Sequence, residues 1–409
     1  MKKLLVIGFV WPEPKSSAAG SRMMQLILMF QEMDYQVTFA STAQNLEFSE
    51  NLNNYNVTTA SISLNDSSFD AFCKNLQPNI VLFDRFLTEE QFGWRVTLAC
   101  KNAIKILDTE DLHSLRLSRQ KAVNANKKFD KADLVQSDIA KREIASIYRC
   151  DLSLMVSEYE MLLLQELFLV PRFILCYLPI LVTKVAENEL AFDQRTDFVF
   201  IGNFLHAPNT DAVQYLYNKI WPKIHKELPN IKMQIYGAYP IQKITELHKP
   251  QKNFIINGRA DSASGTIKRA RVILAPIRFG AGIKGKLLEA MEYGTPSITT
   301  SIGAESMHGT LSWNGFICDD DELFVKRAVE MYTSKTEWTT AKNNGYEIIK
   351  QRYLKSLFAN DFQIKINELV QHFAQIRLNN FTGALLQHHT ANSTMYMSKW
   401  IEEKNKKPL

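Results

Sequence analysis

The segment from Arg271 to Glu305 constrains the fold more than any other part of the chain. It begins with a short apolar run, passes through a glycine-rich loop and continues into residues 286–292, which favour a helix. A Gly-Thr-Pro sequence ends that helix before a second run that is typical of a strand. The helix N-terminus offers unpaired N–H groups, and the loop adds glycines 280, 282 and 285 with Lys284 and Lys286. The segment therefore predicts a phosphate-binding strand–loop–helix–strand unit.

Two familiar phosphate-binding motifs fit this loop by spacing but not by their flanking residues. Gly280 to Gly285 has the G-x-G-x-x-G spacing of dinucleotide-binding folds, which place an acidic residue at the end of the next strand. This chain has Thr299 to Ser301 there, so NAD binding is disfavoured. Gly280 to Lys286 also has the spacing of a P-loop, but Leu287 stands where a Ser or Thr would bind magnesium. A magnesium-dependent NTPase is therefore disfavoured as well.

The sequence APIRFGAGIKGKLLEAMEYGTPSITTSIGAE resembles the donor-binding segment of glycosyltransferase family 4. In that family, two glutamates with E-x7-E spacing flank the glycine loop; the second binds the nucleotide ribose and the first contacts the donor sugar. Glu289 matches the second, whereas Ala281 stands at the position of the first. The resemblance implies a nucleoside-diphosphate sugar, UDP- or GDP-linked, as donor substrate, with no cofactor, no required metal and a retained anomeric configuration.

The same resemblance, with the alternation of strands and helices, predicts an α/β fold of the GT-B type. This fold has two facing Rossmann-like domains with parallel sheets and an interdomain cleft, which a chain of 409 residues can accommodate. We expect an N-terminal acceptor-side domain at residues 1–184, a donor-binding domain at 185–384 and a C-terminal helix at 385–409 that returns to the first domain. The charged segment 185–196 is the expected linker.

The resemblance places the donor nucleotide on the second domain. An apolar run ending at Gly202 and Asn203 is similar to the opening of that domain, where a loop lies beside the phosphates, and His206 is a weaker candidate. Many relatives have Arg or Lys in this loop, so here the positive charge must come from the glycine loop. The predicted donor-binding set is Gly202, Asn203, Arg278, Gly280, Gly282, Ile283, Lys284, Lys286 and Glu289. The alternative is that Lys286 and Glu289 form an ordinary surface pair on one helix face.

Acidic and histidine residues follow the strand expected at residues 104–107. Open α/β sheets bind ligands at the carboxyl ends of their strands. His113 and Asp111 are therefore candidates to contact the donor sugar or the reacting centre, and Lys286 is a candidate to stabilise the departing diphosphate. These three residues form the predicted catalytic set. The alternative for Asp111 is a capping role at the next helix.

Three further features have both a structural and a functional interpretation. Ser17, Gly20 and Arg22 follow the first strand, where the resemblance places cleft-facing residues, but a helix N-terminus with a Ser cap is equally consistent. Ser157 and Glu160 have the spacing of a capping box, which indicates a structural role. In the last helix, the expected packing face consists of Met395, Tyr396 and Trp400.

Positive charge is concentrated in one part of the chain. Residues 114–149 contain nine Lys or Arg against four Asp or Glu, an excess equal to the net charge of +5 for the whole chain. Such a stretch suits an anionic membrane surface, although a solvated face is the alternative. No nucleic-acid-binding motif is visible. The five dispersed cysteines and the absence of a long apolar segment predict a cytoplasmic protein, peripheral on the inner face of the membrane.

These features predict a glycosyltransferase that moves a sugar from its nucleotide donor to a glycan, lipid-linked or other acceptor in cell-surface polysaccharide or glycoconjugate synthesis. Two alternatives stay open. One is a sugar-nucleotide epimerase of the same architecture, which needs no acceptor. The other is a non-catalytic sugar-nucleotide-binding partner of a polysaccharide assembly complex, which the Ala281 substitution favours.

Overall fold

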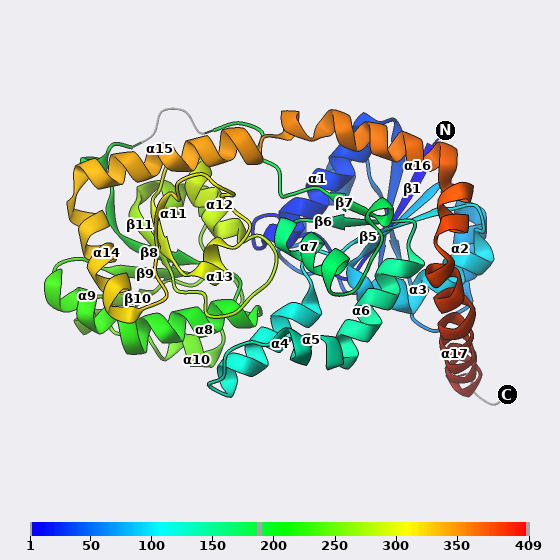
Figure 1. The fold of residues 1–409 in the computed structure, drawn as a ribbon, viewed down its shortest axis with the longest axis horizontal. Coiled ribbons are helices and arrows are strands. Elements are labelled where there is room, and N and C mark those ends of the chain that lie inside the picture. The colour runs from blue at the N-terminus through cyan, green and yellow to red at the C-terminus, as the bar shows by residue number, and fades with distance from the viewer. Residues whose placement is uncertain (1, 186–189, 406–409) are drawn as a thin grey trace.

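The computed structural model describes residues 2–185 and 190–405, without the side chains of residues 389–392. It contains two parallel sheets, each covered by helices on both faces, which lie side by side along the long axis of the molecule (Figure 1). The predicted α/β, two-domain architecture is therefore confirmed. Four residues of the expected linker, 186–189, lie outside the described part of the chain.

The first sheet has seven strands in the order β3-β2-β1-β4-β5-β6-β7. Its strands are β1 (Lys2–Gly8), β2 (Tyr35–Ser41), β3 (Thr58–Ser61), β4 (Ile80–Asp84), β5 (Ile104–Asp108), β6 (Leu152–Met155) and β7 (Leu175–Tyr177). The helices of this domain are α1 (Ala18–Glu32), η1 (Leu52–Tyr55), α2 (Ser68–Leu76), α3 (Arg85–Ala99), α4 (His113–Asn124), α5 (Lys131–Gln136), α6 (Asp138–Arg149), α7 (Glu158–Glu166) and η2 (Arg172–Ile174).

The second sheet has six strands in the order β10-β9-β8-β11-β12-β13. Its strands are β8 (Thr196–Ile201), β9 (Met233–Tyr236), β10 (Phe254–Ile256), β11 (Ala270–Ala275), β12 (Ser297–Thr299) and β13 (Gly315–Ile317). Its helices are η3 (Phe192–Gln194), α8 (Ala207–Tyr215), η4 (Leu216–Ile220), α9 (Trp221–Glu227), α10 (Gln242–Thr245), η5 (Pro250–Lys252), α11 (Ala263–Arg269), α12 (Gly285–Glu292), α13 (Ser301–Ala304), α14 (Asp321–Thr333), α15 (Lys335–Arg352) and η6 (Lys355–Leu357).

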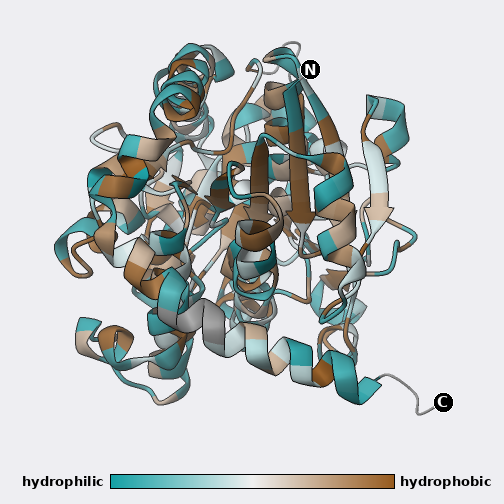
Figure 2. Cartoon of the chain, turned by 90° about the vertical axis from the view of Figure 1, so that its right-hand side faces the viewer, coloured by the Kyte–Doolittle hydropathy of each residue, from teal (hydrophilic) through white to brown (hydrophobic). Residues whose placement is uncertain are grey.

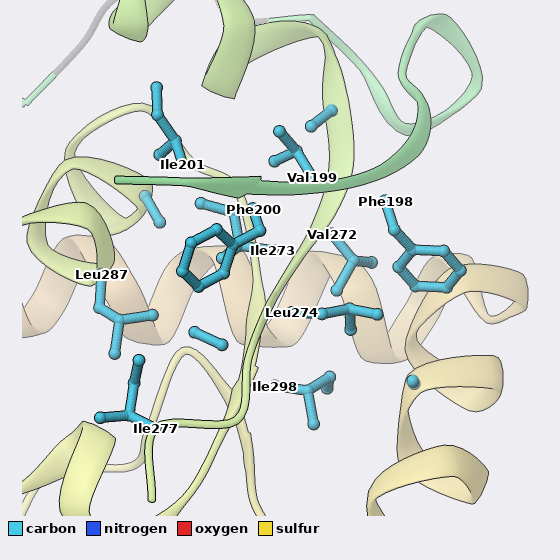
Figure 3. Packing of buried hydrophobic residues seen from close by; sticks show 14 of the residues in the cluster. Phe198, Val199, Phe200, Ile201, Val272, Ile273, Leu274, Ile277, Leu287 and Ile298 are labelled. Carbon is cyan, nitrogen blue, oxygen red and sulfur yellow. The ribbon is translucent and has the colours of Figure 1, made fainter. Parts of the chain in front are cut away.

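The central strands are apolar on both faces because helices cover both sides of a parallel sheet. β4 is buried along its whole length, and the strands near the N-terminus are brown within a shell of mixed helices in Figure 2. In the second domain, β8 and β11 pack against the buried side chain of Leu287 from α12 (Figure 3). Leu287 therefore anchors α12 to the core, which explains why an apolar residue stands at the position that a P-loop would give to a magnesium ligand.

The chain returns to the first domain earlier than residue 385. Helix α16 (Ala359–Asn379) already buries Phe362, Ile366 and Leu369 in the core of the first domain. The ring of Phe362 meets that of Phe30 edge-on at 5.7 Å between centroids. Residues 359–384, which we expected in the second domain, thus belong by packing to the first. The boundary between the two domains is set here by apolar contacts with residues far away in the sequence. The local sequence pattern does not indicate this boundary.

The last helix, α17 (Phe381–Asn405), packs against α3 and α6, as a returning helix should. The expected packing face is wrong, however, because Tyr396 and Trp400 are 66% and 60% exposed. Met395 is half-buried, and Ser398 is the fully buried residue in this part of the helix. Within the described residues, no helix is long and apolar enough to cross a membrane.

Candidate functional site

A cavity of about 620 Å³ lies between the two domains, at the carboxyl ends of both sheets. Loops after β1, β4 and β5 line it from the first domain, and loops after β8, β9 and β11 line it from the second. It brings together these predicted residues: Asp111, His113, Gly202, Asn203, His206, Gly280, Gly282, Ile283, Lys284, Lys286 and Glu289. Residues from sequence positions far apart therefore meet in one cleft, as parallel sheets require.

The N-terminus of α12 forms the basic end of the cavity. The Lys286 ammonium donates a hydrogen bond to Asn209 Oδ1 and lies 4.3 Å from the centroid of the Phe200 ring. Burial lowers the pKa of Lys286 to about 7, although Glu289 opposes the shift. Burial and Glu292 raise the pKa of Glu289 to about 7, against the effect of Lys286. Burial therefore disfavours the charged form of both side chains. An anionic ligand beside Lys286 would stabilise the charged form of the lysine.

Gly202 allows the loop after β8 to approach Lys286 closely. A Cβ atom on Gly202 would lie 2.7 Å from Asn209 Nδ2 and 3.0 Å from Lys286 Nζ. Asn209 Nδ2 donates in turn to the backbone oxygen of Asn203 at 2.8 Å. Asn209, which the local sequence pattern does not single out, therefore holds the lysine in place from the first turn of α8.

Asp111, His113 and Arg116 line the cavity from the first domain. His113 Nε2 lies 3.3 Å from Asp111 Oδ1, and Arg116 Nε donates to Asp111 Oδ2 at 2.7 Å. Burial alone would raise the pKa of Asp111, but Arg116 and His113 lower it below its usual range. Burial lowers the pKa of His113 to about 4, so its ring is neutral at pH 7. Such a ring is a weak general base and is better suited to exchange hydrogen bonds with substrate hydroxyl groups.

Other predicted residues lie elsewhere. The Arg278 guanidinium is outside the cavity lining, pairs with Asp211 and stacks on Tyr215 at 4.6 Å. Arg22 is buried and donates to Asp108 Oδ1 at 2.8 Å, so it supports the sheet instead of facing the cleft. Ser17 and Gly20 do line the cavity, and Ser17 also caps α1 by accepting a hydrogen bond from the Gly20 N–H.

Two residues of the first domain hold the glycine loop of the second. Arg119 donates to the backbone oxygen of Gly280 at 2.8 Å and forms a two-point ion pair with Glu305. Glu160 Oε1 accepts the N–H of Gly282 at 2.6 Å and that of Leu112 at 3.3 Å. Ser157 caps α7, as the capping-box spacing predicts, but the Glu160 side chain turns to the other domain. Neither interdomain contact leaves a signal in the local sequence.

Glu160→Gln is expected to make stability less dependent on pH. Burial and the nearby Asp111 raise the pKa of Glu160 to about 8, although the two N–H groups and Lys284 oppose the shift. Between the usual pKa of a glutamate and pH 8, the folded state holds a proton that the unfolded state lacks, so stability falls as pH rises through this window. The amide of Gln mimics the protonated acid and removes this contribution.

Thermal unfolding from pH 5 to pH 9 measures the effect, and each pKa unit corresponds to about 1.4 kcal/mol. We expect the variant to lose less stability than the native protein at the alkaline end. Glu166→Gln, at an exposed position on the same helix, is the matched control and should leave the slope unchanged. Equal slopes for all three proteins would contradict the assignment of a protonated Glu160.

The second domain matches a known protein family, and almost the whole chain shares its fold with solved structures. Residues 195–334 match the family described as Glycosyl transferases group 1. The matched part lies within the second domain. It contains the whole glycine loop and α12, so the predicted resemblance to glycosyltransferases is confirmed there. A curated relative, an uncharacterised 44.6 kDa protein in the cps region of Klebsiella pneumoniae, is 25% identical over 173 residues, which span 40% of this chain and 45% of the relative.

Solved structures share the fold of almost the whole chain. TarM of S. aureus superposes with a TM-score of 0.69 at 10% identity over 90% of this chain and 99% of TarM. HepE of Anabaena, solved in complex with UDP-glucose, gives a TM-score of 0.61 at 12% identity over 92% of this chain and all of HepE. Sucrose-phosphate synthase of Thermosynechococcus elongatus gives 0.63 at 13% identity, over 90% of this chain and 99% of the synthase. The GT-B fold is therefore confirmed.

Proposed function

We propose that the protein transfers a sugar from a nucleoside-diphosphate sugar to a glycan, lipid-linked or other acceptor. The observation that carries the proposal is the interdomain cavity, which Lys286 and Glu289 of α12 line together with Asp111 and His113 of the first domain. UDP occurs in the HepE and TarM complexes, which supports a UDP-linked donor, with GDP as the alternative. The cps region in the relative's name supports a role in cell-surface polysaccharide synthesis.

Each group has a role that follows from its chemistry. Lys284, Lys286 and the N–H groups at the start of α12 stabilise the negative charge that grows on the departing diphosphate as its bond to the sugar breaks. Glu289 accepts hydrogen bonds from the ribose hydroxyls. His113, held by Asp111, positions a hydroxyl of the donor sugar or of the acceptor. By family resemblance, the anomeric configuration is retained, and no metal or cofactor is required.

The location of the reaction is part of the proposal. The basic residues of α4, α5 and α6 give the first domain a cationic region, in which Lys127, Lys128, Lys131 and Lys141 are exposed. An anionic bilayer attracts each such charge by about 1 kcal/mol near its surface. We place the protein in the cytoplasm, peripherally on the inner face of the membrane, where a lipid-linked acceptor would be available.

Turnover of purified protein separates this function from its two alternatives. A panel of nucleotide sugars is first screened for thermal stabilisation, because a ligand of the native state raises stability by mass action. The stabilising donor is then incubated with chelator, with and without a lipid-linked acceptor. Acceptor-dependent release of nucleoside diphosphate supports the transferase. An epimer formed without acceptor indicates an epimerase, and binding without any turnover indicates a binding module.

A further inference from the structure

Two acidic side chains that line the cavity from the first domain have buried oxygen atoms without a hydrogen-bond partner. Asp84 ends β4, Glu110 follows β5, and both side chains belong to the cavity lining. Within the described residues, Asp84 Oδ1 and Glu110 Oε1 are buried and make no hydrogen bond. Buried polar atoms in native proteins almost always have a partner, so two unpartnered carboxyl oxygens in the lining of one cavity indicate a ligand-binding position.

The backbone at this position has an uncommon conformation. β4 and β5 are paired in register at Asp84 and Asp108, so the segments that follow the two strands lie beside each other. In these segments, Arg85 has a φ of +69° and Glu110 a φ of +62°, in the left-handed region that residues other than glycine rarely adopt. Such backbone strain persists only where the surrounding structure holds it, and it is concentrated at ligand-binding and catalytic sites.

The polar side chains at this position offer both hydrogen-bond donors and acceptors. Asp84 Oδ2 accepts the N–H of Phe9 at 3.0 Å, which holds the carboxylate in place and leaves Oδ1 for a ligand. Arg85 Nε lies 3.5 Å from Asp84 Oδ1, and the Arg85 guanidinium donates no hydrogen bond within the described part of the chain. Burial raises the pKa of Glu110 well above its usual range, and Asp108 and Asp84 add to the shift. The Glu110 carboxyl group therefore favours its protonated form, which both donates and accepts.

The balance of charge at this position favours a neutral ligand. The adjacent Arg85 balances the carboxylate of Asp84, while Glu110 favours its uncharged form. A phosphate or carboxylate group would meet Asp84 with like charge, which is unfavourable. Hydroxyl groups each donate and accept hydrogen bonds, so they match the mixed set of groups that the site offers. The ligand chemistry that fits is therefore an uncharged polyhydroxylated molecule such as a sugar.

An aromatic ring lies beside the polar groups. Phe9 lines the cavity and is 38% exposed, although it is a large apolar residue. The centroid of its ring lies 5.2 Å from the Arg85 guanidinium, so the ring and the cation hold each other in place. Small-molecule sites typically combine aromatic surface with a few convergent polar groups. A sugar has an apolar C–H face and hydroxyl groups at its edge, which match the Phe9 ring and the polar groups respectively.

The position adjoins the glycine loop that we assign to the donor. Glu110 directly precedes Asp111, whose carboxylate lies 3.3 Å from His113 Nε2. The backbone oxygen of Glu110 would lie 3.2 Å from a Cβ atom on Gly282. A molecule bound by Glu110 would therefore lie beside the proposed donor, where an acceptor has to be.

We propose that Asp84, Arg85 and Glu110 bind hydroxyl groups of an uncharged sugar residue on the acceptor. This inference rests on the proposed function, and it narrows the acceptor to one whose residue at this position is a neutral sugar. Asp84 accepts a hydrogen bond from one hydroxyl group, and Arg85 and Glu110 donate to its neighbours. Phe9 contacts the C–H face of the ring.

Saturation-transfer NMR with methyl glycosides tests the site directly. The probes are the methyl α-glycosides of glucose, galactose, mannose and N-acetylglucosamine, each added in the presence of UDP or GDP, whichever the protein binds. At least one glycoside is expected to bind the native protein. Its binding to Asp84→Asn and to Glu110→Ala should be about tenfold weaker, because each variant removes a hydrogen bond of a charged or buried group. Glu110→Gln should keep most of the affinity, since an amide donates and accepts like a protonated acid. Glu166→Ala, at an exposed position on α7, is the control and should bind like the native protein.

A charged probe tests the predicted neutrality of the ligand. Methyl α-D-glucopyranosiduronate has the ring of the methyl glucoside with a carboxylate in place of the hydroxymethyl group. It is expected to bind more weakly than every neutral glycoside that binds, because its charge would meet Asp84. Tighter binding of the uronate would overturn the proposal. Glycoside binding that is unchanged in both Asp84→Asn and Glu110→Ala would overturn it as well.

Calorimetry with nucleoside diphosphate distinguishes a failure of this inference from a failure of the proposed function. We expect native-like affinity in the Asp84 and Glu110 variants, because the proposed nucleotide contacts Lys286 and Glu289 belong to α12 of the second domain. A native protein that binds neither UDP nor GDP would contradict the proposed function. A native protein that binds one of them but none of the glycosides would contradict the acceptor site alone.

Discussion

Replacing Gly282 with valine is expected to abolish binding of a nucleoside diphosphate. Gly282 has a φ of +64°, which a β-branched residue adopts only with strain. A Cβ atom there would lie 3.0 Å from Asp111 Cβ and 3.2 Å from the backbone oxygen of Glu110, so the glycine loop and the segment after β5 would have to shift apart. Such a shift would also strain the hydrogen bond from the Gly282 N–H to Glu160. Isothermal titration calorimetry with UDP and GDP measures the loss.

Two other glycines serve as controls for this variant. Gly280→Ala should be tolerated, because the added Cβ would meet Ile277 and Lys284 only at 3.7 Å. Gly258→Val imposes the same backbone strain, since Gly258 has a φ of +70°, but its Cβ would meet no atom within 4 Å. We expect Gly258→Val to lose stability while keeping most of its nucleotide affinity. Native-like affinity of a folded Gly282→Val protein would contradict the assigned role of the loop.

Lys286→Ala is expected to weaken binding of a nucleoside diphosphate tenfold or more and to change nucleoside binding little. A charge-assisted hydrogen bond contributes about 1.5–3 kcal/mol, and only the phosphates meet this side chain in the proposed complex. Because the pKa of Lys286 is lowered to about 7, the native affinity should also fall as pH rises from 6.5 to 8.5. Calorimetry with chelator present measures both effects.

Glu289→Gln tests the proposed contact with the nucleoside part of the ligand, whereas Lys286→Ala tests the contact with the phosphates. It is expected to weaken nucleoside and nucleoside diphosphate alike, because the proposed contact of Glu289 is with the ribose. Lys335→Ala, which removes an exposed lysine paired with Asp193, is the control for loss of a positive charge and should leave both affinities unchanged. Unchanged diphosphate affinity in Lys286→Ala, or ATP binding that requires magnesium, would contradict the donor-site assignment.

The sequence by itself determined the local units and predicted several residues of the second domain that line the cavity. Strand, glycine loop and helix are local structures, so their order follows from the apolar runs, glycines and helix formers near Gly282. Leu287 disfavours a P-loop by its side-chain chemistry alone, and its burial in the core gives the physical reason for an apolar residue there. Lys286 and Glu289 could be assigned together because residues three apart on a helix share a face.

Tertiary structure alone decided how the two domains meet. Glu160 and Gly282 are 122 residues apart, and Arg119 and Glu305 are 186 apart, so no local rule relates them. Glu160 has the spacing of a capping box, but the partner of its carboxyl group is set by the packing of the second domain against the first. Sequence likewise could not predict that Asp211 pairs with Arg278 outside the cavity.

In the C-terminal helices, too, the sequence predicted the secondary structure, whereas the tertiary structure decided the packing. The helical character of the last segment and its return to the first domain were predictable, but its orientation was not. Tyr396 and Trp400 were expected to pack inward because large apolar residues usually do. Arg95 is buried in the first domain, where it pairs with Asp70 at 2.7 Å and also donates a hydrogen bond to Ser398 of α17. The contact with Ser398 exists only in the folded protein, and it accompanies an orientation of α17 in which Tyr396 and Trp400 are exposed.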